Sequence, residues 1–142
     1  MVADGRTGDD VGTRERYFDS LCRAHGLELG LADSCDGWSL ISAHRGSLRI
    51  FFEYERGFWW FGVGSTADGR PACSVEDIAT RFPSTRVLRA GAQRLSLEEQ
   101  RLFIEQHWNE LEAMFSPIGI AATKAWLADR LNAYWAQFTS ST

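Results

Sequence analysis

An α+β fold is predicted by three observations: two Arg-Gly pairs in the middle of the chain, aromatic-rich segments beside them, and helical patterns on either side. Arg45-Gly46 and Arg56-Gly57 each separate two runs of strand-forming residues, and glycine accepts the positive φ that tight hairpin loops demand. We therefore expect a three-stranded antiparallel meander, which a fourth or fifth strand can extend. An N-terminal helix and two longer C-terminal helices are expected to pack on it.

Before the meander, apolar side chains recur at helical spacing. They predict a helix from Thr13 to about His25, and Gly26 follows as a stop signal. Residues 28–36 are expected to be a loop or a short strand. The strands of the meander are then expected at Trp38–His44, Ser47–Glu55 and Phe58–Gly64.

The hairpin loops determine which side chains share a face of the sheet, because side chains alternate along a strand. If the first Arg-Gly pair is the whole of its loop, His44 lies opposite Ser47. If the second pair is the whole of its loop, Glu53 lies opposite Trp60. One face is then apolar throughout and is expected to be the core face: Ile41, Ala43, Leu48, Ile50, Phe52, Tyr54, Trp59, Phe61 and Val63.

The second face of the predicted sheet mixes aromatic rings, carboxylates, an arginine and a histidine. Its candidate binding residues are Trp38, His44, Arg49, Phe51, Glu53, Glu55, Phe58 and Trp60. Such a mixture is typical of a protein–protein hot spot and also of the wall of a polar ligand pocket. A third alternative is that a helix covers this face, so that the set has only a structural role.

Downstream of the meander, the sequence predicts four further elements. They are a short helix at Val75–Phe82, a short edge strand at Thr85–Leu88, a long helix from Ser96 to about Phe115, and a last helix from about Ile120 to Phe138. Ser74 is placed to cap the short helix. Ser96 and Glu99 have the spacing of a capping box, which opens the long helix.

The composition argues against several classes of function. The chain has 142 residues and a formal charge of −4, whereas nucleic-acid binding needs a basic surface. Its three cysteines fit no metal spacing and suit a reducing compartment. Signal-peptide and membrane-span patterns are both missing. We expect a cytoplasmic protein with a disordered lead-in at 1–12 and a single domain at 13–142, with no metal, cofactor, membrane or nucleic-acid partner.

One glycine-rich motif matches a cofactor fingerprint by spacing. The segment Gly62-Val-Gly64-Ser-Thr-Ala67 has the G-x-G-x-x-A pattern of dinucleotide-binding folds. That fingerprint must open a helix, whose N-terminus receives the pyrophosphate. Asp68 and Pro71 follow at once and are turn residues, so we interpret the match as chance.

The sequence also gives little support for catalysis or metal binding. Glu53 and Glu55 could work as a carboxylate pair, with His44 as a base, but neither a nucleophile nor an oxyanion hole is evident beside them. Cys22 and His25 lie three residues apart, without the second pair of ligands that zinc requires. We assign no catalytic residue and expect the protein not to be an enzyme. A hydrolase that uses these carboxylates, or a small-molecule-binding domain, remains the alternative.

Four parts of the chain carry a resemblance: the aromatic block from Ile50 to Gly64, the short helix, the segment Ser96-Leu-Glu-Glu-Gln100 and the segment from Trp108 to Glu112. Together they resemble small uncharacterised bacterial domains. Some of these domains are assigned as immunity proteins, which bind and neutralise a toxin. The size, acidity and helix–meander order are also similar to type III secretion chaperones, although two consecutive C-terminal helices depart from that pattern. Both resemblances imply a protein-binding module, monomeric or homodimeric, whose partner is a toxin or an effector.

Overall fold

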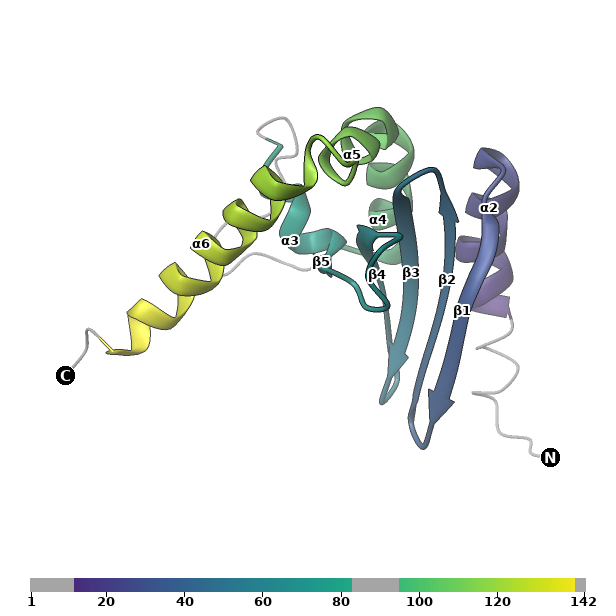
Figure 1. Ribbon diagram of the computed structural model, residues 1–142. Helices are drawn as coiled ribbons and strands as arrows, with labels where there is room; N and C mark the ends of the chain where they lie inside the picture. The colour runs from purple at the N-terminus through teal and green to yellow at the C-terminus, as the bar shows by residue number, and fades with distance from the viewer. Residues whose placement is uncertain (1–11, 83–94, 140–142) are drawn as a thin grey trace.

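The computed structural model describes residues 12–82 and 95–139 and confirms an α+β fold (Figure 1). One antiparallel sheet has the order β1-β2-β3-β4-β5, with strands β1 (Glu28–Cys35), β2 (Trp38–Arg45), β3 (Leu48–Glu55), β4 (Phe58–Ser65) and β5 (Cys73–Ser74). The helices are η1 (Arg14–Asp19), α2 (Ser20–His25), α3 (Val75–Ala79), α4 (Leu97–Gln106), α5 (Trp108–Met114) and α6 (Ile120–Thr139). Residues 1–11 of the expected lead-in, and the expected strand Thr85–Leu88, lie outside the described residues.

The N-terminal helix is confirmed as η1 followed directly by α2. The first of these is a π-helical segment, and Gly26 ends the second with a φ of 62°. Phe18 and Leu21 are completely buried against the sheet. Their spacing on one helical face is the pattern that predicted this helix.

The interpretation of residues 28–36 as a loop or a short strand missed most of β1, which is an eight-residue strand. It pairs with β2 along its whole length, apart from a bulge between Leu29 and Ala32. Every one of its side chains is exposed, so it lacks the apolar alternation that marks a half-buried strand. Gly37, with a φ of 72°, completes the loop that joins it to β2.

The predicted register of the β3–β4 hairpin is confirmed, with Glu53 opposite Trp60. Its loop places Arg56 at a φ of 50° and Gly57 at 92°, which meets the requirement of a type I′ turn for two positive φ values.

The predicted register of the β2–β3 hairpin is wrong by two residues. Arg45 belongs to β2 and pairs with Leu48, so the loop is Gly46–Ser47 and His44 lies opposite Arg49. A shift of two residues leaves every side chain on its predicted face, because the side-chain period of a strand is also two.

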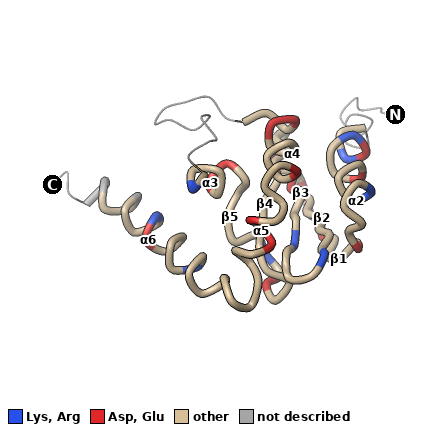
Figure 2. The backbone as a smooth tube through the Cα atoms, turned by 90° about the horizontal axis from the view of Figure 1, so that it is seen from above, with Lys and Arg blue, Asp and Glu red and all other residues tan. Residues whose placement is uncertain are grey.

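The helices η1, α2, α4 and α5 cover the core face, and Figure 2 shows α2 and α4 on one side of the strands. Six of the predicted core-face residues are completely buried: Ala43, Leu48, Ile50, Phe52, Phe61 and Val63. Phe52 is central among them, because its ring stacks on Phe18 at 5.8 Å and on Trp59 at 4.6 Å between ring centroids. Ile41 and Trp59 are half-buried at the margin of this core.

The predicted caps of α3 and α4 are both confirmed. The Ser74 hydroxyl accepts a hydrogen bond from Asp77 N, and Ser96 and Glu99 form the full capping box. The single long helix expected from Ser96 to Phe115 is wrong, however, because His107 has a φ of −114° and divides it into α4 and α5. α6 follows as the last helix at its predicted position.

Candidate functional site

The second face of the sheet is divided into a covered half and an open half. The loop between β4 and β5 crosses the covered half. A Cβ on Gly62 would lie 2.8 Å from Pro71 Cβ, and a Cβ on Gly64 would lie 3.2 Å from Ala72 N. Phe51 is completely buried beneath this loop. Close packing against the loop is therefore the role of the glycine motif that matched a dinucleotide fingerprint.

Arg49 holds the covered half together. Its guanidinium donates hydrogen bonds to Ser42 Oγ at 3.2 Å and to the Thr66 carbonyl at 3.1 Å. A Cβ on Gly30 would lie only 2.9 Å from Arg49 Nη1, so the bulge of β1 rests on this side chain. Arg49 and Phe51 were both predicted to be binding residues. Their contacts within the chain indicate that they stabilise the packing of the loop on the sheet.

His44 also lies at the covered end, with its Nε2 at 3.7 Å from a carboxylate oxygen of Glu28. Glu53 lies opposite Leu40. The position facing Glu53 is thus four residues along β2 from His44, a distance of about 13 Å at the usual strand rise. The structure does not bring His44 together with Glu53 and Glu55 into one acid–base group.

The open half holds the other five candidate residues, which we call the aromatic–acidic patch: Trp38, Glu53, Glu55, Phe58 and Trp60. Trp38 Nε1 donates a hydrogen bond of 2.8 Å to the Glu53 carboxylate. Phe58 is 66% exposed, and Trp60 is half-buried directly opposite Glu53. This end of the sheet presents aromatic rings beside carboxylates without a covering helix or loop in the described part of the chain.

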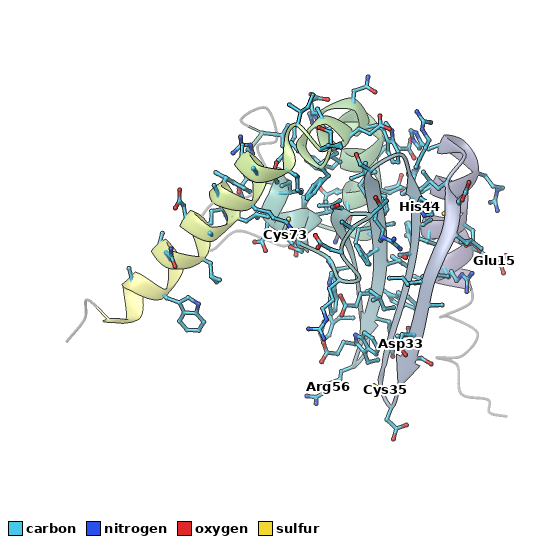
Figure 3. All side chains as sticks on the ribbon, viewed as in Figure 1. Glu15, Asp33, Cys35, His44, Arg56 and Cys73 are labelled. Carbon is cyan, nitrogen blue, oxygen red and sulfur yellow. The ribbon has the colours of Figure 1, made fainter. Side chains whose placement is uncertain are left out.

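β1 adds two side chains to this end of the sheet that sequence reasoning missed. Asp33 pairs with Leu40, and Cys35 pairs with Trp38, so both share the face of the patch. Figure 3 shows Asp33, Cys35 and Arg56 together at the same end of the sheet. The interpretation of residues 28–36 as a loop or a short strand gave no register with β2, so the position of these two side chains was not predicted.

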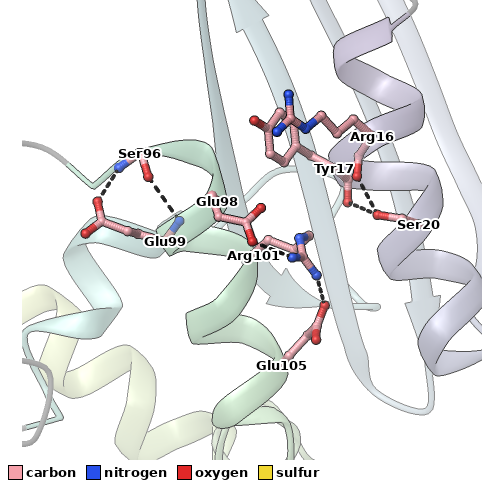
Figure 4. A network of polar contacts seen from close by, with 8 residues as sticks. All are labelled: Arg16, Tyr17, Ser20, Ser96, Glu98, Glu99, Arg101 and Glu105. Carbon is pink, nitrogen blue, oxygen red and sulfur yellow. Dashed lines mark hydrogen bonds and ion pairs between the residues drawn. The ribbon is translucent and has the colours of Figure 1, made fainter.

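A cavity of about 520 Å³ lies beside the patch, where β4 extends beyond the short β5. Its lining residues include Phe58, Trp59, Trp60, Glu76, Leu95 and Gln100. The capping box of Ser96 and Glu99 fixes the start of α4 at this cavity (Figure 4).

The buried Gln100 side chain takes the place of a strand beside β4. Its Oε1 accepts a hydrogen bond from Phe61 N at 2.8 Å, and its Nε2 donates one to the Leu95 carbonyl at 3.0 Å. The carboxylate of Glu76 then accepts from Leu95 N at 2.6 Å. Nothing in the sequence distinguishes Gln100 from other helical glutamines, so this role was not predicted.

The three cysteines are free thiols in different surroundings. Burial raises the pKa of Cys22 to about 11 and that of Cys73 to about 12, and nearby Asp19 and Asp77 add to the respective shifts. Both thiols are therefore poor nucleophiles at neutral pH, since the thiolate is the reactive form. Cys35 is exposed at the edge of the patch.

Residues 12–82 and 95–139 contain no group of three or more His, Cys, Asp or Glu side chains arranged to hold a metal ion. Within the same residues, no helix combines the length and the apolar character that crossing a bilayer requires. In comparisons with known proteins, no family model, curated protein or solved structure matches this chain. The candidate function therefore depends on the geometry of the patch itself.

Proposed function

We propose that this protein is an immunity-like binding module, which docks a partner protein of toxin or effector type on the aromatic–acidic patch. The observation that carries the proposal is the division of the second sheet face: the loop between β4 and β5 covers one half, and none of the described helices or loops covers the aromatic half. Tryptophan and other aromatic anchors supply most of the binding energy in protein interfaces. Trp38 and Trp60 are half-buried, and are therefore held in place before a partner arrives.

The charges around the patch favour a partner with a basic surface. Asp33, Glu53 and Glu55 lie on this face, and Arg56 is the cation in the adjoining loop. The whole chain has a formal charge of −4. Complementary charge accelerates association, and like charge disfavours it. An acidic protein is therefore expected to bind the patch poorly.

Affinity capture from the organism's own cell extract tests the proposal. The wild-type chain, the Trp60→Ala variant and an Ile118→Ala control are immobilised in parallel, and captured proteins are identified by mass spectrometry. Ile118 is 95% exposed and lies outside the sheet, so its variant should retain the partner. Trp60→Ala should weaken binding of that partner by about 2 kcal/mol. Equal capture by all three chains, or no specific capture by the wild type, would contradict the proposal.

Small-molecule binding is a second candidate, and the cavity beside Trp60 favours it. Its volume of about 520 Å³ falls within the range of about 300–1,000 Å³ typical of ligand pockets. A compound that binds there should raise the melting temperature of the protein by mass action. The hydrolase alternative would require turnover that disappears in a Glu53→Gln variant.

A further inference from the structure

A groove lies between the first half of α6 and the loop that joins β4 to β5. It consists of two adjoining cavities of about 580 and 470 Å³, which share Ala72 and Leu127. The first cavity lies against residues 68–72 of the loop, and the second continues along α6 to Leu131. No residue of the aromatic–acidic patch lines either cavity, so the groove is a separate feature of the surface.

Hydrogen bonds within the chain hold both walls of the groove in place. On the α6 side, the Thr123 hydroxyl donates a hydrogen bond of 2.6 Å to the Met114 carbonyl. On the loop side, Ala72 N donates one of 2.8 Å to the Val63 carbonyl. The groove is therefore formed before a ligand arrives, which lowers the entropic cost of binding.

Six side chains of the lining are apolar or uncharged at neutral pH. They are Pro71, Ala72, Cys73, Leu127, Ala128 and Leu131. The Cys73 thiol belongs with them because burial raises its pKa to about 12, so it stays protonated. Such a lining favours a hydrocarbon occupant, since contact with it removes apolar surface from water.

The charged side chains of the lining are three cations and two carboxylates. Lys124 Nζ lies 3.5 Å from a carboxylate oxygen of Asp68. Arg130 Nη2 lies 3.6 Å from a carboxylate oxygen of Asp77. Arg70 lines the first cavity, and no carboxylate of the described residues forms an ion pair with it. One guanidinium at this end of the groove is therefore available to an anionic ligand.

We infer that this groove binds a fatty acid, with the carboxylate at Arg70 and the hydrocarbon chain directed along α6 towards Leu131. A guanidinium binds a carboxylate through two parallel hydrogen bonds, and one carboxylate balances the single unpaired cation. Residues 124–131 span about 11 Å at the helical rise, which suits a chain of medium length. A peptide fits the groove less well, because its backbone N–H and C=O groups need hydrogen-bond partners that apolar side chains do not supply.

Calorimetric titration of the whole chain with octanoate, decanoate and dodecanoate, each below its micelle concentration, tests the inference. Each added methylene should tighten binding by up to about fourfold, until the chain extends beyond Leu131. A wild type that binds none of the three acids overturns the inference.

The position of the carboxylate is tested by removing the unpaired cation. Arg70→Gln should weaken decanoate binding at least about fivefold, because it removes a charge-assisted contact. The matched control is Arg23→Gln, which removes the same charge from an exposed position on α2 and should bind like the wild type. Decanol, which has no carboxylate, should bind the wild type and Arg70→Gln equally. Equal decanoate affinity in the two variants overturns the inference.

The path of the hydrocarbon chain is tested by filling the second cavity. Ala128→Phe adds a ring to its lining and should weaken decanoate binding, whereas Ala125→Phe adds the same ring at an exposed position that lines neither cavity. Circular dichroism should report a folded protein for both variants, because both positions are exposed. Equal affinity of the two phenylalanine variants overturns the inference. Trp60→Ala should bind decanoate normally, so partner docking and fatty-acid binding can fail separately.

Discussion

Trp38 Nε1 donates a 2.8 Å hydrogen bond to the carboxylate of Glu53 across two neighbouring strands of the sheet. The bond orients an aromatic ring and an acid at the open end of the second face. It also occupies one oxygen of the carboxylate, which supports a role for Glu53 in recognition.

A double-mutant cycle on this pair should give a coupling of about 1 kcal/mol in the free energy of unfolding, because the bond is charge-assisted and partly buried. The variants are Trp38→Phe, Glu53→Ala and their combination, measured by urea denaturation. Glu55 lies directly opposite Trp38 and provides the matched cycle, in which coupling should be near zero. Equal coupling in the two cycles would contradict the importance of the hydrogen bond.

The two neighbouring tryptophans of β4 should differ in their effect on stability. Trp59 stacks on Phe52 at 4.6 Å and on Tyr54 at 4.8 Å between ring centroids, so Trp59→Ala should cost about 3 kcal/mol of unfolding free energy. Trp60 lies on the other face, and Trp60→Ala should cost clearly less. Urea denaturation of both variants checks the order. A larger loss for Trp60→Ala would mean that the open half of the sheet is covered.

Gln100→Met should cost about 2 kcal/mol of unfolding free energy, because it leaves the buried Phe61 N–H without an acceptor. Methionine keeps nearly the same volume, so the loss reports hydrogen bonding and not a cavity. Gln106→Met, at an exposed position of the same helix, is the control and should be nearly neutral. Similar losses in the two variants would show that Gln100 has no special role at the edge of β4.

Gly62→Ala should destabilise the protein by about 2 kcal/mol, because the added Cβ overlaps Pro71 and pushes the covering loop away from the sheet. Gly69→Ala is the matched control in the same loop, since its nearest contact would be an ordinary 3.9 Å to Leu31 Cδ1. Thermal denaturation compares them. A neutral Gly62→Ala would mean that the loop does not pack on the second face.

Alkaline pH should destabilise the fold in a manner that depends on Cys22 and Cys73. Their pKa values are raised from 9.0 to about 11 and about 12, so the unfolded chain loses these protons first. The free energy of unfolding should therefore fall as pH rises from about 9 towards 12. A double Cys22→Ala, Cys73→Ala variant should show a shallower fall over this range. An identical pH dependence would contradict the burial of these thiols.

The sequence was enough to assign each side chain of the meander to a face of the sheet, because this assignment depends only on the alternation of side chains along a strand. The error of two residues at Gly46–Ser47 changed cross-strand partners but moved no side chain to the other face. The full length of β1 was not predictable, and only a loop or a short strand was expected, since its exposed side chains give little apolar alternation and Gly30 interrupts it. The break at His107 was hidden because the apolar stripe continues across it into α5.

The candidate site was predictable only in part. Alternation placed Trp38, Glu53 and Trp60 on one face, and the structure brings them together at its open end. The burial of Phe51 and the bonds of Arg49 depend on a loop that crosses the sheet. Such a long-range contact has no local pattern in the sequence. Strand alternation alone therefore could not distinguish the covered half of the face from the open half.

The most direct test of the patch as a docking surface for a basic protein is the association rate of the captured partner, measured at low salt. Glu55→Lys reverses an exposed charge in the patch, and Glu15→Lys makes the same change on the exposed side of the N-terminal helix. If the patch attracts a basic partner, Glu55→Lys should slow association about tenfold, while Glu15→Lys should leave the rate nearly unchanged. Equal rates for the two variants and the wild type would contradict docking at this patch.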